Sequence, residues 1–158
     1  MKHFLVLLLL AGLISACSQT DGEKIRGKWR FSKMVANGDL IVSDDPTEQQ
    51  QIIDNAVYGM RDQLTNMNET EDAYAKKLRH DMELMLKVTF DFTADSTVVV
   101  SSNSPKNASQ SVWRYRLESE KKQLVIYEPT RTVIYTYALR DNLLTLSDDK
   151  DSIVFKKH

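Results

Sequence analysis

The sequence predicts a mainly β domain, an antiparallel sandwich or up-and-down barrel, with a two-helix hairpin inserted after its first strands. Apolar and polar residues alternate in residues 25–32 and again in short segments from residue 88 onward, which is typical of strands with one buried face. In residues 46–86, apolar residues instead recur every three or four positions, as in amphipathic helices. No internal period of about 20–50 residues is visible, which argues against propellers and solenoids.

The first strands are predicted by the alternation in residues 25–32, where Trp29 and Phe31 lie on the apolar side. Residues 37–39, Asn-Gly-Asp, form a turn signal. The apolar residues 40–42 that follow are expected to form a short partner strand.

The helical segment is expected to contain two helices. Asp45 is a capping residue, and Pro46 and Glu48 follow at positions that favour a helix start. Residues 66–68 break the pattern, and residues 68–71 resemble a second capping box. The apolar stripes comprise Ile53, Ala56, Val57, Met60, Leu64 and Met67, then Tyr74, Leu78, Met82 and Met85. Helices of roughly 20 and 16 residues joined this tightly form a helical hairpin.

A run of short strands joined by polar turns is predicted after Leu86. The expected strands are 88–92, 97–101, 113–117, 124–127, 132–139, 143–146 and 152–155. Consecutive short strands with this spacing favour an antiparallel meander.

The N-terminus predicts an export signal. Lys2 is followed by the apolar residues 4–10 and then by small residues before Cys17. The apolar stretch ends before Ser15 and is shorter than the roughly 20 residues that a membrane-spanning helix needs. We therefore interpret residues 1–16 as a signal peptide.

The segment Ile14-Ser15-Ala16-Cys17 resembles the lipobox of bacterial lipoproteins. The resemblance implies that a diacylglyceryl group is attached to the Cys17 thiol and that the chain is cut just before it. Residues 17–24 would then be a lipidated tether and residues 25–158 the folded domain, anchored in the cell envelope and expected at the outer membrane, on either face. The alternative is an ordinary signal peptide, which would leave an exported protein with one unpaired thiol, because Cys17 is the only cysteine.

Charge and cysteine content restrict the partners and the source of stability. Loss of Lys2 with the signal lowers the number of basic residues from 21 to 20 against 22 acidic residues, a formal charge of −2. No basic stripe is visible, so nucleic acid is not predicted as a partner. A single cysteine permits no disulfide within the chain, and the domain must be held together by its core.

Gly27-Lys28-Trp29 on the first strand, the antiparallel meander and a final strand ending in Lys156-Lys157 carry a further resemblance. With the lipobox and the polar tether, they resemble the small lipocalin-like lipoproteins of Bacteroidetes, whose first strand carries a Gly-x-Trp motif. The resemblance implies a lipocalin-like β-barrel. In lipocalins the tryptophan packs beneath a basic residue from late in the chain, and Arg140 is the candidate for that residue.

Residues 46–86 depart from the lipocalin pattern. A typical lipocalin has strands in this region and a helix near its C-terminus, whereas this chain inserts a helical hairpin and ends on a strand. It is therefore left open whether the mouth of the barrel accepts a ligand or is filled or covered by the hairpin.

Residues that could carry catalysis are sparse. His80 lies in a charged segment and is expected to be a solvated surface residue, and only the terminal His158 accompanies it after signal cleavage. No Cys or His cluster has metal-ligand spacing, and neither a phosphate loop nor a nucleophile elbow is present. The acidic residues in 148–151 are expected to form a turn. The sequence therefore predicts no enzyme, no catalytic residues, no metal site and no cofactor.

Aromatic residues on the predicted strands are the candidates for binding a small hydrophobic ligand. They are Trp29, Trp113, Tyr115, Tyr135 and Tyr137. A barrel lined by such groups can hold an apolar or amphiphilic molecule, and tyrosine suits a half-wet pocket because its hydroxyl takes a polar partner. The alternative interpretation is an ordinary packed core.

Three functions remain. The first is a non-catalytic binding protein, which requires an apolar cavity lined from several strands. The second is an interaction or inhibitor module for another envelope protein, which requires a filled barrel and an exposed apolar patch on the hairpin. The third, an enzyme with dispersed acidic residues, is the least favoured and requires paired carboxylates with raised pKa values.

Overall fold

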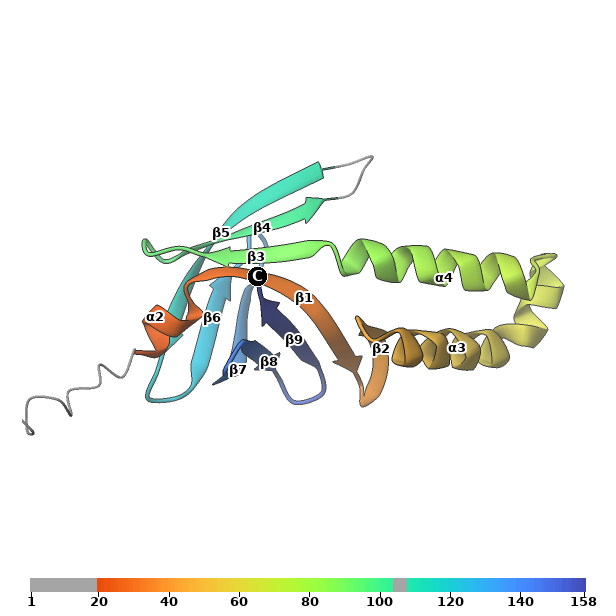
Figure 1. Cartoon of the computed structure of the whole chain (residues 1–158), viewed down its shortest axis with the longest axis horizontal. Helices are drawn as coiled ribbons and strands as arrows, with labels where there is room; N and C mark the ends of the chain where they lie inside the picture. Colours follow the sequence, from red (N-terminus) through yellow and green to blue (C-terminus); the bar gives the residue numbers. More distant parts are fainter. Residues whose placement is uncertain (1–19, 104–107) are drawn as a thin grey trace, which may run out of the picture.

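The strands form one antiparallel sheet that closes into a barrel, and a helical pair extends from it (Figure 1). The computed structural model describes residues 20–103 and 108–158, so the predicted signal peptide and Cys17 lie outside the described residues. The helices are α2 (Asp21–Ile25), α3 (Pro46–Met67) and α4 (Glu71–Met85). The strands are β1 (Gly27–Ala36), β2 (Asp39–Ser43), β3 (Val88–Phe92), β4 (Thr97–Asn103), β5 (Ala108–Glu118), β6 (Gln123–Tyr127), β7 (Thr132–Arg140), β8 (Leu143–Ser147) and β9 (Ser152–Lys157).

Strand β1 closes the barrel because both of its edges are paired. Along one edge, residues 27–30 pair with β3 and residues 33–36 pair with β2. Along the other edge, residues 29–35 pair with β9, with a shift of register around Ser32. The barrel wall therefore consists of the eight strands β1 and β3–β9, and the predicted antiparallel barrel is confirmed.

The first elements begin differently from the sequence expectation. Residues 21–24, assigned to the tether, form helix α2 together with Ile25, because Thr20 at the N-cap and Glu23 make a reciprocal capping box. Strand β1 consequently starts at Gly27 rather than at residue 25. Gly27 has a φ of +103°, a backbone conformation that residues with a side chain rarely adopt. It lies where the chain turns from the helix into the strand.

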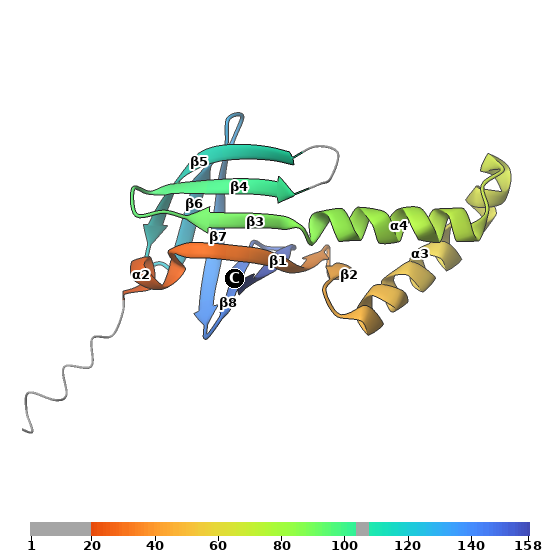
Figure 2. The same ribbon diagram turned by 45° about the horizontal axis from the view of Figure 1, so that its top comes forward.

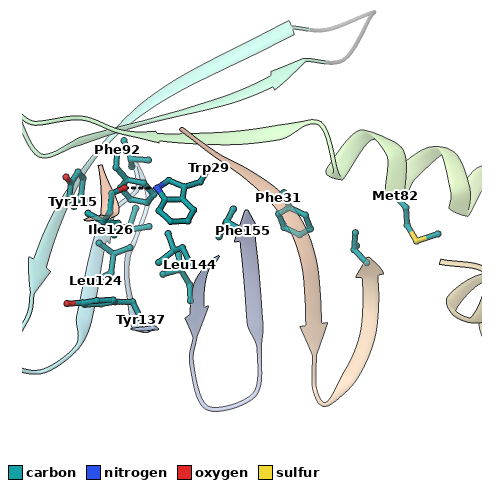
Figure 3. Packing of buried hydrophobic residues seen from close by; sticks show 14 of the residues in the cluster. Trp29, Phe31, Met82, Phe92, Tyr115, Leu124, Ile126, Tyr137, Leu144 and Phe155 are labelled. Carbon is teal, nitrogen blue, oxygen red and sulfur yellow. Dashed lines mark hydrogen bonds between the residues drawn. The ribbon is translucent and has the colours of Figure 1, made fainter. Parts of the chain in front are cut away.

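Side chains from each of the eight barrel strands pack in the interior (Figure 3). The most enclosed are Trp29, Phe31, Phe92, Val98, Tyr115, Leu124, Ile126, Tyr137, Leu144, Leu146 and Phe155, none more than 8% exposed. Aromatic rings meet edge to face, with centroids 5.1 Å apart for Phe92 and Tyr115 and 5.8 Å apart for Phe31 and Phe155. The alternation read from the sequence thus supplies one shared core.

The helical pair between β2 and β3 confirms the predicted insertion. Asp45 accepts hydrogen bonds from the amides of Thr47 and Glu48 at the start of α3, and Asn68 ends that helix in a left-handed conformation. Thr70 caps α4. With 22 residues, α3 is about 33 Å long. Figures 1 and 2 show α3 and α4 running antiparallel and away from the barrel.

Apolar packing joins only the base of the hairpin to the barrel. Ile53 of α3 and Met82 of α4 are at most 5% exposed and pack in the same cluster as Val42 of β2. The hairpin packs mainly on β2 and the end of β4, and Figure 1 shows most of its length extending beyond the barrel.

Ion pairs also join the base of the hairpin to the barrel. Asp44 lies 2.7 Å from the Lys156 ammonium on β9 and 3.7 Å from the Arg30 guanidinium on β1. Glu48 lies 2.8 Å from Lys33 and accepts a hydrogen bond from the Ser43 hydroxyl. Partly exposed pairs add little stability, and these join Asp44 and Glu48, at the start of α3, to β1 and β9.

Replacement of Trp29 by alanine is expected to lower the free energy of unfolding by about 3–5 kcal/mol, because it empties the largest fully buried site in the barrel. Val112→Ala on the outer face of β5, where the side chain is 63% exposed, is the control and should change it by about 0.5 kcal/mol or less. Urea unfolding measures both. Equal losses for the two variants would contradict the proposed core.

Candidate functional site

An open groove of about 950 Å³ runs between α3 and α4. Its walls are one face of each helix, because the contributing residues recur every three or four positions. They are Gln50, Ile53, Asp54, Val57, Tyr58 and Arg61 on α3, and Glu71, Asp72, Ala75, Lys76, Arg79, His80 and Glu83 on α4. Among these residues, Ile53, Val57 and Ala75 are buried or half-buried, whereas the charged residues, which carry both signs, are exposed.

Two polar bridges connect the helices at the ends of this groove. Near the hairpin tip, the Arg61 Nε donates to Glu71 over 2.8 Å. Nearer the barrel, Arg79 donates to the Gln50 side-chain oxygen over 3.1 Å. Between them, Tyr58 is 75% exposed, with the Arg61 guanidinium 5.7 Å from its ring centroid. The two bridges therefore fix the helices to each other at both ends of the groove, and Tyr58 exposes its ring between them.

Trp29 lies at the barrel end that α2 covers, which we call the closed end. The turns β3–β4, β5–β6 and β7–β8 also lie there. The Trp29 Nε1–H donates to the Ile25 carbonyl over 2.6 Å, and Ile25 itself is fully buried (Figure 3). The cation above the Trp29 ring is the Lys157 ammonium, 5.2 Å from its centroid, rather than the expected Arg140. Lys157 also donates to the Lys24 carbonyl over 3.0 Å, which fastens α2 to β9.

Tyr115 and Tyr137 pack in the same half of the barrel and are 8% and 3% exposed. The Tyr115 hydroxyl donates to the Thr93 carbonyl over 3.0 Å, and the Tyr137 hydroxyl donates to Asp21 over 2.7 Å. Burial raises the pKa of both tyrosines. Their polar atoms, like that of Trp29, are thus already paired within the protein.

Trp113 and Tyr135 are only half-buried and face the opposite end of the barrel, which we call the open end. Burial, followed by the charge of Glu128 in the β6–β7 connection, raises the pKa of Tyr135. Trp113 packs edge-on against Phe90, with centroids 6.4 Å apart. Further half-buried apolar residues on this side of the core are Met34, Val88, Val100 and Ile153.

The five predicted ligand residues therefore fall into two sets. Trp29, Tyr115 and Tyr137 are core residues of the closed half, whereas Trp113 and Tyr135 remain partly accessible in the open half. The groove was not expected as a site. Ile53 and Val57 were recognised as part of a helical stripe, whereas Tyr58 and Ala75 were not singled out, and nothing in the sequence shows how far the barrel covers that stripe.

Metal and membrane-spanning features were searched in the described part of the chain. Residues 20–103 and 108–158 contain no cluster of His, Cys, Asp and Glu that could hold a metal ion. Within the same ranges, no helix has both the length and the hydropathy needed to cross a bilayer.

Comparison with known proteins supports the fold. No protein-family model and no curated protein matches the sequence. A crystal structure of a DUF4847 family protein from Bacteroides vulgatus ATCC 8482 superposes with a TM-score of 0.53 at 12% sequence identity, over 84% of this chain and 92% of that chain. At this identity the match shows a shared β-barrel fold and assigns no activity.

Asp21→Asn is expected to destabilise the protein at neutral pH, with the effect becoming smaller as the pH falls below 4. Hydrogen bonds from Lys122 and Tyr137 hold the pKa of Asp21 below its ordinary value of 3.8. A carboxylate with a lowered pKa stabilises the fold above its unfolded-state pKa, and this contribution is lost as the pH falls through the folded-state value. Urea unfolding of both proteins between pH 7 and pH 3 measures the difference.

Asp149→Asn, in the exposed β8–β9 turn, is the control for loss of one negative charge. A difference between Asp21→Asn and the unchanged protein that persisted undiminished in acid would exclude the ionised Asp21 as its cause.

Proposed function

We propose that this chain is a lipid-anchored, non-catalytic protein of the bacterial cell envelope, at the outer membrane, that binds another envelope protein through its helical hairpin. The lipobox-like segment ending in Cys17 supports the anchor. The lipocalin-like barrel then serves as a platform for the hairpin.

The projecting hairpin with its uncovered groove is the observation that carries this proposal. Packing against the barrel buries its base, whereas Tyr58 in the middle of α3 and Met67 at the far end of that helix are 75% and 65% exposed. Exposed apolar groups beside polar ones are typical of interaction sites, and Tyr58 lines the groove together with charged residues of both helices. The closed half of the barrel, by contrast, is packed with its own side chains.

An amphipathic helix of the partner is the occupant that fits the groove. The wall from Gln50 to Arg61 spans about three turns, or roughly 17 Å. A third helix would lay its apolar face on Val57 and Ala75, as in helix-in-groove recognition. Its flanking charges would meet Lys76 and Glu83, so a partner helix with both signs of charge is favoured over a strongly acidic or basic one.

Site-specific photo-crosslinking in cells tests this proposal. A photoreactive phenylalanine analogue at Tyr58 should give one discrete protein adduct. The same analogue at Ile134, a large apolar residue 54% exposed on the outer face of β7, is the matched control and should give none. Lys76→Glu should weaken the Tyr58 adduct, because it reverses a charge at the border of the groove.

Absence of an adduct at Tyr58, or equal adducts at the two positions, would argue against the hairpin as the recognition surface. An adduct that Lys76→Glu leaves unchanged would place the partner outside the groove.

A second candidate function is binding of a small amphiphile at the open end. Half-buried Trp113 and Tyr135 support it, because an apolar chain could cover them without displacing the closed-half core. Dodecanoate added to the domain should shift the tryptophan emission, and Trp113→Phe should abolish the shift. Tyr127→Phe, on the outer face, is the control. A shift retained in Trp113→Phe, or no shift in the unchanged domain, would contradict this function.

A further inference from the structure

The closed end of the barrel is fastened to the first described residues of the chain. Ile25 is fully buried in the core, and the Ile25 carbonyl accepts the Trp29 N–H. Asp21 lies 2.5 Å from the Lys122 ammonium and accepts the Tyr137 hydroxyl. Helix α2 is therefore held by contacts to three barrel strands and to the β5–β6 turn, and Thr20 at its start has a fixed place on this end.

Only three peptide steps separate Thr20 from Cys17. A chain spans at most about 3.3–3.6 Å per residue, so the Cys17 position lies within roughly 10 Å of Thr20. Acyl chains attached to Cys17 must insert below the headgroups to anchor the protein. A lipid at Cys17 would accordingly bring the closed end into contact with the bilayer surface.

The hairpin lies at the other extreme of the molecule. Figures 1 and 2 show α2 and the connection between α3 and α4 at opposite ends of the long axis. Strand β1 starts beside α2 and leads toward the base of the hairpin. A bilayer in contact with the closed end is therefore on the far side of the barrel from the groove.

We infer that the closed end, formed by α2 and the β3–β4, β5–β6 and β7–β8 turns, rests on the lipid headgroups and points the hairpin away from the membrane. This inference rests on the lipid anchor of the proposed function and adds a membrane-contact surface and an orientation. The surface carries both signs of charge, with Lys24, Arg26 and Arg140 beside Glu23 and Glu120. The short tether, rather than attraction to anionic lipid, is what holds it in place.

Fluorescence quenching in vesicles tests the orientation. The full lipoprotein is purified from membranes and reconstituted in phosphatidylcholine vesicles that contain a lipid with a nitroxide on its headgroup. Because the only native cysteine is Cys17, the lipidated protein offers a single free thiol once one is introduced. Glu120→Cys places the dye in the exposed β5–β6 turn, and Asp62→Cys places it on the exposed face of α3. Each change removes one negative charge, so the two variants are matched.

Strong quenching at position 120 and none at position 62 is the expected result. Insertion of about 30 Gly and Ser residues before Thr20, which gives a flexible reach of roughly 30 Å, should abolish most of the quenching at position 120. Equal quenching at both positions, stronger quenching at position 62, or quenching at position 120 unaffected by the insertion would overturn the inference. Mass spectrometry of the N-terminal peptide separates the two proposals, because an unmodified Cys17 would refute the anchor itself.

Discussion

Pairing of β1 along both of its edges is the constraint on which the rest of the structure depends. Strand β1 receives β3 and β2 on one side and β9 on the other, so the first strand of the chain is joined to the last. Closure leaves the barrel wall without free edges, which open sheets must protect by other means. It also brings Trp29 and Lys157 together, although 128 positions separate them in the sequence. Without a disulfide, this strand pairing and the enclosed side chains hold the ends of the chain together.

The two halves of the barrel use similar residue types for different purposes. In the closed half, every aromatic polar atom among Trp29, Tyr115 and Tyr137 has a partner within the chain. An unpaired buried polar atom lowers the stability of the fold, and these hydrogen bonds avoid that loss. They also fix the orientation of the aromatic side chains. In the open half, Trp113 and Tyr135 are partly solvated and free of that restriction. The same alternation of aromatic residues therefore leads to a closed core at one end and an accessible surface at the other.

Much of the fold could be predicted from the sequence, because period-two and helical spacing are local properties. The helical pair and the meander follow from them directly. Helix α2 was missed since five residues are too few to show a period, although Thr20 and Glu23 have the spacing of a capping box. The basic residue above Trp29 was assigned to Arg140 rather than Lys157, because register in a closed barrel is not visible in the sequence.

The candidate site was harder to predict than the fold. Residues such as Ile53 and Val57 identify an apolar helix face, yet whether that face is covered depends on how far the barrel reaches along the hairpin. Strand alternation predicts that the aromatic candidates point into the barrel. It does not tell which of them meet an internal hydrogen-bond partner, as Tyr137 meets Asp21 from a distant part of the chain.

Both ends of the helical insertion lie on the same edge of β1. Strand β2 leaves that edge at residues 33–36, and β3 returns to it at residues 27–30. The eight wall strands consequently close without any contribution from the hairpin. Such an arrangement is modular, because the strand pairings of the wall do not involve α3 and α4, and sequence changes along these helices leave the register of the barrel unchanged. A hairpin of different length or sequence could therefore be grafted between β2 and β3 without changing any strand pairing of the wall.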